Sequence, residues 1–314
     1  MKFGFTIFLI LASTLVFAQD PQSSQLYSSP LLYNPGFAGS AGCSRAFLGY
    51  RNQWPAISGT FVTYNFTYDQ RVNFLHGGVG LRVMHDRAGE GTLKTWSVSG
   101  VYSFQFKIAD KITIAPGIEF GLVNKSIDFS KLTFGDMIDP RYGFIYSTTT
   151  TRPASGNRNF FDLSAGLTAY SKTFFAGFSA NHLTQPKEGN SSSRLPIRLT
   201  AIAGADFKLA GIFGMMPCVL YQQQQNFQSL IFNQNFRIAF AVIGAGLRAN
   251  FYNFDSMIFT AGVQFKPVRV FYSYDLTVSK LSNNTAGSHE LSVSFKFNCK
   301  NKQDKIISPR YWGG

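Results

Sequence analysis

The chain has 314 residues, of which 14% are charged and 16% aromatic, and its formal net charge is +13. A soluble domain usually carries about 25% charged residues, so this chain has less charge than a water-exposed surface normally shows. A basic net charge is typical of nucleic-acid binding only when lysine and arginine cluster on one face or helix. Here they are scattered along the sequence, so we expect no nucleic-acid partner.

Residues 1–18 have the pattern of a secretory signal peptide. Lys2 supplies the positively charged start, residues 3–11 supply the apolar region, and a small-residue cleavage site ends at Ala18. We therefore expect cleavage before Gln19, with residues 1–18 excluded from the fold.

The rest of the chain has a membrane-like composition but no apolar stretch of the roughly 20 residues that a membrane helix needs. Apolar and polar residues alternate instead, in segments of about ten residues, which is the pattern of a transmembrane β-barrel. In residues 269–279, for example, Tyr272 and Tyr274 fall on one face and Ser273 and Asp275 on the other. A charge on the lipid face costs about 2–4 kcal/mol at mid-membrane, so the restriction of charges to one face indicates a polar lumen.

Alternation and turn residues together predict about fourteen antiparallel strands. This even number places the start of the first strand and the end of the last strand on the same side of the membrane. The predicted strands span residues 44–54, 57–71, 73–85, 92–107, 111–125, 158–172, 173–184, 194–208, 211–224, 227–237, 239–250, 254–266, 268–279 and 287–298. Short connections alternate with longer ones, which is the arrangement of outer-membrane barrels. We therefore predict an all-β transmembrane barrel over residues 44–298, in the outer membrane of a Gram-negative bacterium, with both termini in the periplasm.

Two segments flank the predicted barrel. Residues 19–43 have no regular period but carry Leu26, Tyr27 and Phe37, which a disordered tether would not need. We interpret them as an ordered extension that packs into or under the barrel mouth, and the alternative is a flexible leader. Residues 299–314 are predicted to be a periplasmic tail, which is either a docking peptide for a periplasmic partner or a frayed end.

The positions of the cysteines raise the question of a disulfide. Cys43 lies just before the first predicted strand and Cys299 just after the last. In a closed barrel these strands are neighbours, and the periplasm is oxidising. A Cys43–Cys299 disulfide at the seam is therefore one hypothesis, and the alternative is three unrelated thiols, with Cys218 buried in a strand.

The sequence predicts no catalytic, cofactor or metal site, and we predict that the protein is not an enzyme. His289 and Glu290 lie in the last hairpin, with Asp275 across from them on the preceding strand. A structural network in the lumen explains these three residues better than catalysis, because partly buried carboxylates need hydrogen-bond donors. Nothing distinguishes one serine as a nucleophile activated by a base. Residues 85–91 lack the ligand spacing of a calcium site.

The longer loops are the candidate surfaces for binding a protein partner, since recognition usually resides in loops. They are predicted at residues 127–157, 183–193 and 280–287. The longest contains the arginine and aromatic residues that binding hot spots favour, namely Arg141, Tyr142, Phe144 and Tyr146. The alternative is that this loop folds inward and constricts the pore.

Motifs at the two ends of the mature chain support a family resemblance. The first is QDPQSSQLYSSPLLYNPGFAGS at 19–40, followed by GYRNQWPAISGTFVTYNFTYD at 49–69, and the second is YSYDLTVSKL at 272–281 with GSHELSVSFKF at 287–297. The motif residues are Asn34, Pro35, Gly39, Arg51, Gln53, Trp54, Tyr274, Asp275, His289 and Glu290. In these positions the chain resembles the PorP/SprF family of type IX secretion system membrane proteins.

The resemblance implies an outer-membrane barrel that helps to export, or holds at the cell surface, an adhesin-like cargo with a type B C-terminal sorting domain. It also implies contacts with outer-membrane lipid and with periplasmic components of the secretion and gliding machinery. Two other functions stay open, a small-solute channel and a structural link to the periplasmic machinery. The state of the lumen distinguishes the cargo anchor from the channel, since an anchor predicts a filled lumen and a channel predicts an open one.

Overall fold

A computed structural model describes residues 20–89, 92–108, 111–132, 134–149, 156–188, 194–279, 285–299 and 309. The predicted signal peptide at 1–18 lies outside these residues, as does the predicted tail apart from Cys299 and Pro309, so both stay predictions. In the described part of the chain, no helix is both long and apolar enough to cross a membrane.

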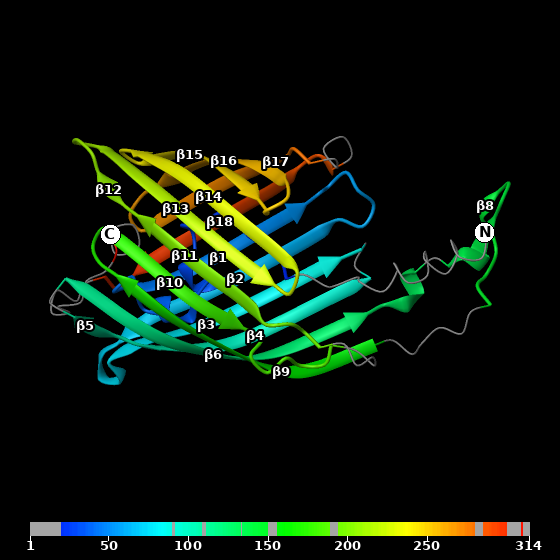
Figure 1. Cartoon of the computed structure of the whole chain (residues 1–314), viewed down its shortest axis with the longest axis horizontal. Coiled ribbons are helices and arrows are strands. Elements are labelled where there is room, and N and C mark those ends of the chain that lie inside the picture. The colour runs from blue at the N-terminus through cyan, green and yellow to red at the C-terminus, as the bar shows by residue number, and fades with distance from the viewer. Residues whose placement is uncertain are drawn as a thin grey trace.

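The described residues form a β-barrel (Figure 1). Its strands are β1 Ser44–Gln53, β2 Phe61–Val72, β3 Gly77–Ala88, β4 Leu93–Phe104, β5 Phe106–Ile108, β6 Ile112–Ile127, β9 Gly156–Tyr170, β10 Phe174–Asn181, β11 Arg198–Ala205, β12 Phe207–Lys208, β13 Phe213–Gln224, β14 Phe227–Ile238, β15 Ala241–Ala249, β16 Phe254–Gln264, β17 Val268–Thr277 and β18 Ser288–Phe297. Because β5 and β12 are short continuations of β4 and β11, the described sheet of sixteen strands is a barrel of fourteen. Antiparallel pairing of β1 with β18, from Ser44–Phe297 to Gln53–Ser288, closes it. The predicted all-β barrel is confirmed.

The observed strands lie close to the predicted ones, with two informative shifts. We predicted a strand from residue 73, but Asn73–Leu75 form a 3₁₀ helix, η4, and His76 is left-handed at φ 51°, so β3 begins at Gly77. We predicted another from residue 57, but β2 begins at Phe61. Two further strands, β7 Ile138–Asp139 and β8 Gly143–Phe144, pair only with each other and form a separate hairpin.

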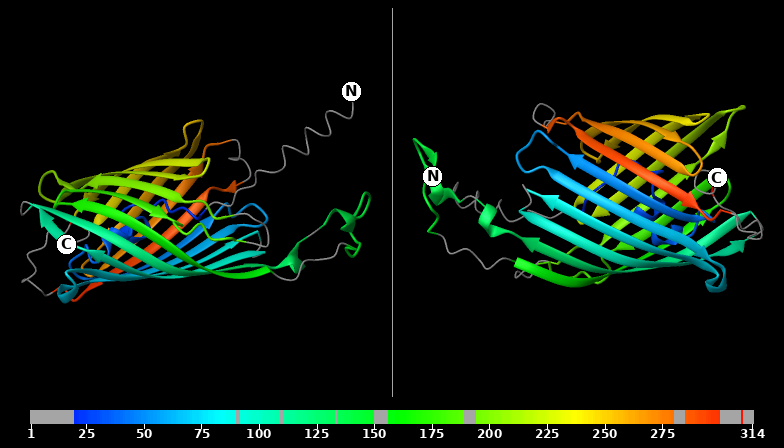
Figure 2. Two further views of the ribbon diagram at one scale, coloured as in Figure 1. Left: turned by 60° about the horizontal axis from the view of Figure 1, so that its bottom comes forward. Right: turned by 180° about the vertical axis from the view of Figure 1, so that it is seen from behind.

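The two ends of the barrel differ in the length of their connections. One end, here called the turn end, carries short connections at residues 73–76, 171–173, 209–212, 239–240 and 265–267. The other, here called the loop end, carries the longer connections at 54–60, 128–155, 182–197 and 278–287, together with shorter ones at 89–92, 225–226 and 250–253, and the β7–β8 hairpin projects from it (Figure 2). This asymmetry is the one that the sequence predicts.

The period of two residues along each strand separates an apolar outer face from a mostly polar inner face. Val98, Phe120 and Leu276 are exposed on the outside. Ser99 and Ser273, on the same strands as Val98 and Leu276, are buried inside. An apolar exterior over a polar interior is the arrangement that a barrel needs in lipid.

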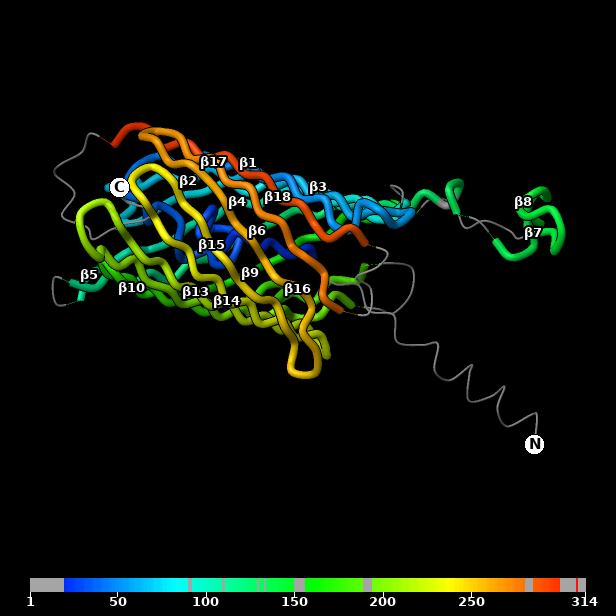
Figure 3. Tube along the Cα trace, turned by 90° about the horizontal axis from the view of Figure 1, so that it is seen from above, coloured from blue at the N-terminus to red at the C-terminus, as the bar shows by residue number. Residues whose placement is uncertain are grey.

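Residues 20–43, hereafter called the leader, lie inside the barrel (Figure 3). The leader contains two 3₁₀ helices, η2 Pro30–Leu32 and η3 Pro35–Phe37, and nearly all of its residues from Ser24 onward are buried. It begins at the loop end, where Asp20 contacts His182 and Arg198, and ends at the turn end, where Cys43 precedes β1.

The path of the leader corrects one expectation. We expected both ends of the mature chain on the same side of the barrel, because an even number of strands brings the start of β1 and the end of β18 together. These two strand ends do meet at the turn end. Asp20 lies at the opposite end, because the leader crosses the whole lumen before it enters β1.

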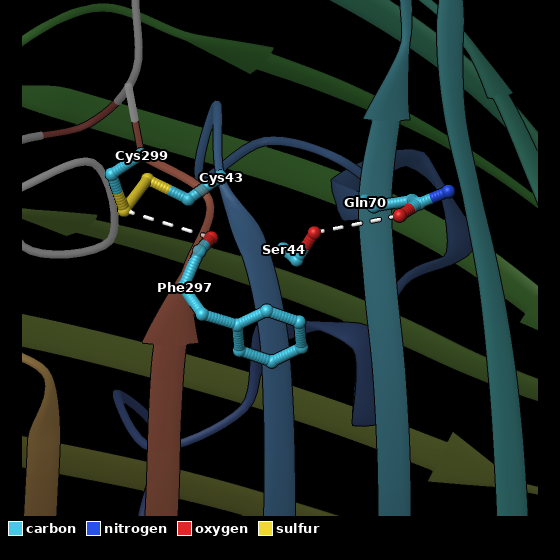
Figure 4. The surroundings of a disulfide bond; sticks show 5 residues. All are labelled: Cys43, Ser44, Gln70, Phe297 and Cys299. Atoms are coloured by element: carbon cyan, nitrogen blue, oxygen red, sulfur yellow. Dashed lines mark hydrogen bonds between the residues drawn. A yellow bond between two sulfur atoms is a disulfide. The ribbon is translucent and has the colours of Figure 1, made fainter. Parts of the chain in front are cut away.

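A disulfide joins Cys43 to Cys299 at the seam between β1 and β18 (Figure 4). The two Cα atoms are 4.7 Å apart, although the residues are 256 positions apart in the sequence. Cys218 is free and buried on β13.

Candidate functional site

The leader packs against an apolar area of the inner wall. Leu26, Tyr27, Tyr33 and Phe37 form one buried cluster with side chains that point into the lumen. These wall residues are Tyr170, Phe175, Ile202, Met216, Cys218, Leu220, Ile231, Val242, Ile258 and Phe271. Apolar side chains at lumen positions would be unfavourable in a water-filled pore, and burial against the leader accounts for them.

Tyr27 fills a break in the barrel wall. Pairing of β11 with β13 runs to Gly204–Cys218, and β12 resumes it at Phe207–Met215. Between these pairs the hydroxyl of Tyr27 lies 2.8 Å from the carbonyl oxygen of Ala205 and 2.6 Å from that of Pro217. The strict alternation that the sequence predicts across residues 194–208 is therefore interrupted, and Ala205 and Asp206 are both buried.

A buried network of charged groups holds the first part of the leader. Ser24 donates from Oγ to Asp275 Oδ2 at 2.6 Å, and its backbone N–H donates to Glu290 at 2.8 Å. Arg51 donates to Asp275 at 2.7 Å and to Glu290 at 2.9 Å. Arg248 donates to Asp275 at 3.0 Å and to Ser24 Oγ at 2.5 Å. The leader, β1, β15, β17 and β18 are thus joined at one point.

The structure separates the three residues that the sequence grouped at the closing hairpin. Asp275 and Glu290 point into the lumen and are buried. His289 lies on the outer face, where Nδ1 is 2.7 Å from the hydroxyl of Tyr272 and its ring is 5.1 Å from that of Tyr274. Successive residues of a strand point to opposite faces, so His289 and Glu290 cannot share one network. The expectation that His289 belongs to a lumen network with Asp275 and Glu290 is therefore wrong.

The motif residues Asn34 and Pro35 fix the leader at the turn end. Pro35 starts η3, and the side chain of Asn34 accepts a hydrogen bond from the backbone N–H of Gly36 at 2.8 Å. The amide of Asn34 also donates to the carbonyl oxygens of Leu167 and Phe178, at 3.2 and 2.8 Å. The leader therefore hydrogen-bonds directly to the backbones of β9 and β10.

Glycines in the barrel wall let the leader approach this closely. A Cβ atom on Gly117 would lie 2.5 Å from the backbone nitrogen of Gly36, and one on Gly78 would lie 2.1 Å from the carbonyl oxygen of Ala38. Real Cβ atoms do not occur at such distances, so backbone packs on backbone here. This contact seats the leader directly on the wall toward the turn end.

A second buried ion pair holds the last part of the leader. Arg45 Nε lies 2.8 Å from Asp69 Oδ1, and both side chains are almost fully buried. Asp69 also accepts a 2.8 Å hydrogen bond from the backbone N–H of Gly39, a motif residue in the left-handed conformation at φ +70°. The carboxylate thus joins β1, β2 and the leader.

Charged side chains also hold the start of the leader at the loop end. Asp20 lies 2.7 Å from His182 Nε2 and 3.1 Å from Arg198, and His182 Nδ1 lies 2.7 Å from Asp162. Burial lowers the pKa of His182, but the two neighbouring carboxylates outweigh it and raise that pKa to about 9. Burial raises the pKa of Asp20, but Arg198 and His182 hold it well below its usual range. Both groups are therefore charged at neutral pH.

The four residues predicted to bind a partner lie together on the β7–β8 hairpin and the residues just after it, which stand away from the barrel mouth (Figure 1). Tyr142, Phe144 and Tyr146 are 69%, 60% and 53% exposed, and the guanidinium of Arg141 lies 5.7 Å from the centre of the Tyr142 ring. Asp139 accepts hydrogen bonds from the backbone N–H groups of Arg141 and Tyr142 and from the Tyr146 hydroxyl. The segment is preformed and does not fold inward over the pore.

The remaining motif residues stabilise the loop end beside the seam. Trp54 is left-handed at φ 58°, its N–H donates to the carbonyl oxygen of Gly287, and its ring packs edge-on against Phe61. Gln53 pairs with Phe61 on one side and Ser288 on the other.

Among the described residues, no group of three or more His, Cys, Asp or Glu is arranged to hold a metal ion.

Sequence reasoning missed several residues of these networks, namely Ser24, Arg45, Asp69, Asp162, His182 and Arg248. The available signal was that most of the charged ones occupy lumen positions near an end of a strand. Their partners lie on other strands or in the leader, which a single sequence does not reveal.

The sequence matches the family described as "Type IX secretion system membrane protein PorP/SprF" over residues 15–295. No curated protein matches. The fold is similar to the Ralstonia pickettii toluene transporter TbuX, with a TM-score of 0.51, 9% identity, and 87% of this chain and 93% of that chain covered. Other similar structures are the P. putida toluene transporter TodX (TM-score 0.49, 10% identity, 88% and 95% covered) and the Acinetobacter baumannii outer membrane protein Omp33 (0.46, 10%, 82% and 100%).

At 9% identity the likeness to TbuX concerns the fold alone, and it agrees with the closed outer-membrane barrel. The family match is of a different kind, because it spans most of the chain and includes both groups of motif residues. The protein therefore belongs to the PorP/SprF family of type IX secretion system membrane proteins, and it is an outer-membrane β-barrel.

Proposed function

We propose that the protein binds a secreted, adhesin-like cargo with a type B C-terminal sorting domain, and anchors it at the cell surface or assists its export. One observation carries the proposal: the leader fills much of the lumen, while a preformed aromatic hairpin projects from the loop end. A barrel whose interior is occupied by its own chain offers partners its end surfaces. The exposed side chains of that hairpin are of the kinds that dominate binding energy at protein interfaces.

In this proposal the loop end faces the cell exterior and the turn end faces the periplasm. Outer-membrane barrels carry short periplasmic turns and longer extracellular loops. The hairpin then meets the cargo outside, and the apolar outer face contacts outer-membrane lipid. The link to periplasmic secretion and gliding components, through residues 299–314, stays a prediction because nearly all of that tail lies outside the described residues.

The alternative function is a small-solute channel, since TbuX and TodX are described as toluene transporters. The contacts of the leader weigh against a solute path along the barrel axis. Backbone of the leader packs on backbone of the wall at Gly78 and Gly117, and Asn34 and Asp69 bind it to three strands. A solute would have to displace all of these contacts.

Affinity purification of the tagged barrel in mild detergent, with mass spectrometry of the co-purifying proteins, tests the proposal. A large secreted protein with a C-terminal sorting domain should co-purify. The triple variant Tyr142→Ala/Phe144→Ala/Tyr146→Ala should bind it at least about 30-fold more weakly, because truncation of even one hot-spot residue costs about 2 kcal/mol or more. The matched control is Tyr252→Ala, which removes an 87% exposed tyrosine from another connection at the loop end. Equal recovery of the cargo by the triple variant and the control would refute the role of the hairpin.

A further inference from the structure

The lumen contains a polar cavity at the loop end, here called the cup, with a volume of about 130 Å³. Its wall is formed by β2, β3, β4, β6, β9, β11, β13 and the connection between β10 and β11, and residues 20–23, Leu32 and Tyr33 of the leader line its other side. The cup therefore lies between the leader and the barrel wall at the loop end.

The cup is long enough along the barrel wall for an extended side chain. Along β4 its lining runs from Leu93, at the start of the strand, to Ser99. Six residues of a strand correspond to about 20 Å. A cavity of 130 Å³ has room for about ten water molecules, which is enough for one extended side chain.

The charges that line the cup do not balance. Its acidic groups are the carboxylates of Asp20, Asp86, Glu119, Asp162 and Glu188. Its basic groups are Arg82, Lys125, His182 and Arg198. With His182 protonated, five negative charges face four positive ones among the described side chains of the lining.

The excess negative charge resides on Asp86. Arg82 pairs with Glu119, Lys125 with Glu188, Arg198 with Asp20, and His182 with both Asp20 and Asp162, so these four cations are matched by four carboxylates. Within the described residues, Asp86 forms no ion pair and accepts one hydrogen bond, from Thr63 Oγ1 at 2.6 Å. A half-buried carboxylate without a cation is costly, so the cup favours entry of a positive charge.

The cup also has unused hydrogen-bond donors. The Nε atoms of Arg82 and Arg198 are buried and have no partner in the described structure. Peptide carbonyl oxygens are suitable acceptors for them. A basic side chain reaching Asp86, carried on a backbone whose carbonyl groups face the two arginines, would satisfy all three groups.

We propose that the cup receives a lysine or arginine side chain from an extended segment of the partner, with its cationic group against Asp86. The inference rests on the proposed function for the identity of the partner, and it adds a second contact to that of the hairpin. The hairpin would supply apolar contact area outside the barrel. The cup would bind one basic side chain of the partner segment that lies across the loop end.

Thr95 provides a reporter position, because it lines the cup and pairs directly with Asp86 between β3 and β4. The purified full-length Thr95→Cys barrel is labelled with iodoacetamide in the presence of acetyl-Gly-Lys-Gly-amide or acetyl-Gly-Glu-Gly-amide. The lysine peptide should slow labelling about fivefold or more, and the glutamate peptide should have little effect, because opposite charges attract at this site and like charges repel. Barrel without the introduced thiol controls for Cys218, which is buried.

Adding Asp86→Asn should weaken protection by the lysine peptide about tenfold, since it removes the charge that pairs with the ligand. Asp255→Asn is the matched control, a 42% exposed carboxylate at the loop end that does not line the cup. Absence of protection, equal protection by both peptides, or protection that Asp86→Asn leaves intact would each overturn the inference. If the lysine peptide slows labelling of the Thr95→Cys thiol while the triple hairpin variant still binds its cargo, the inference about the cup holds and the proposed role of the hairpin fails. Loss of cargo by the hairpin variant without peptide protection would instead support the hairpin and refute the cup.

Discussion

The hydroxyl of Ser24 donates a 2.6 Å hydrogen bond to Asp275, a residue 251 positions later in the chain. This contact joins the leader to the hairpin that closes the barrel. Arg51 and Arg248 contact both residues, so two cations stabilise one carboxylate at the point where the leader begins its course through the lumen. The same residues therefore close the barrel and fix the leader within it.

Asp275→Asn should release the first part of the leader. It leaves two buried arginines short of a carboxylate, and breaking a buried ion pair costs about 3–5 kcal/mol. Chymotrypsin cleavage at Tyr27, which is buried in the native protein, measures the release. Asp255→Asn, which removes a partly exposed carboxylate 3.9 Å from Arg248, should leave Tyr27 protected. Equal protection in both variants would show that the network does not hold the leader.

Gly117→Ala should weaken the packing of the leader on the wall toward the turn end, because the new methyl group would overlap the backbone of Gly36. Overpacking of this kind costs about 1–3 kcal/mol. Gly100→Ala is the matched control, since a Cβ atom there meets nothing within 4 Å. Thermal unfolding in detergent should show a lower midpoint for Gly117→Ala alone, and matching midpoints would contradict the close packing.

The sequence alone was sufficient to predict the barrel and its strand order, because each strand repeats the same two-residue pattern over an apolar and a polar face. It did not predict that β11–β17 carry Ile202, Leu220, Ile231 and Ile258 on the lumen side as a wall for the leader. Those residues break the apolar-out rule, and only the position of Leu26 and Tyr27 explains them.

The motif residues were identified from the sequence, but most of their roles were not. The residue types of Asn34, Pro35 and Gly39 are typical of a turn. The structure shows that Asn34 docks η3 on β9 and β10 and that Gly39 binds Asp69. Arg51 meets Asp275 and Glu290 only because β1 pairs with β18, a contact between the two ends of the chain. Sequence separation hides such pairs, whereas alternation along a strand reveals only which face a residue occupies.

The ion pair between His182 and Asp20, which fixes the start of the leader, should weaken at high pH. The folded pKa of His182, about 9, exceeds its ordinary value of 6.5, so its stabilising effect is complete below pH 6.5 and is lost as the pH rises through about 9. This pKa difference corresponds to stabilisation on the order of 3 kcal/mol. The lowered pKa of Asp20 acts in the opposite sense, since its effect is present above its ordinary value of 3.8 and is lost in acid.

Chymotrypsin cleavage of the leader between pH 6 and pH 10 measures this effect and should accelerate toward the alkaline end, after correction for the pH profile of the protease. His182→Gln should cleave at a high and nearly constant rate over the same range, because it lacks the titrating group. A wild-type rate that does not change with pH would show that His182 contributes nothing to holding the leader.

Loss of the Cys43–Cys299 disulfide should lower stability without opening the fold. The bond closes a loop between residues 256 positions apart, and removal of a native disulfide typically costs about 2–5 kcal/mol. Non-reducing mass spectrometry should recover Cys43 and Cys299 in one cross-linked peptide and Cys218 as a free thiol. The double variant Cys43→Ser/Cys299→Ser should still form the barrel, because ten residue pairs between β1 and β18 remain. A free Cys43 in the mature protein would contradict the structure.

Ion conductance across a planar lipid bilayer tests the central claim most directly, namely that the leader closes the lumen and leaves function to the loop end. The wild-type barrel should show no steady conductance, and a barrel lacking residues 20–38 should show a large ohmic current, because the close contact of the leader with Gly78 and Gly117 is then gone. Gly100→Ala serves as the folded control and should behave as the wild type does. A steady open-pore current through the wild-type barrel would contradict the account and favour a solute channel.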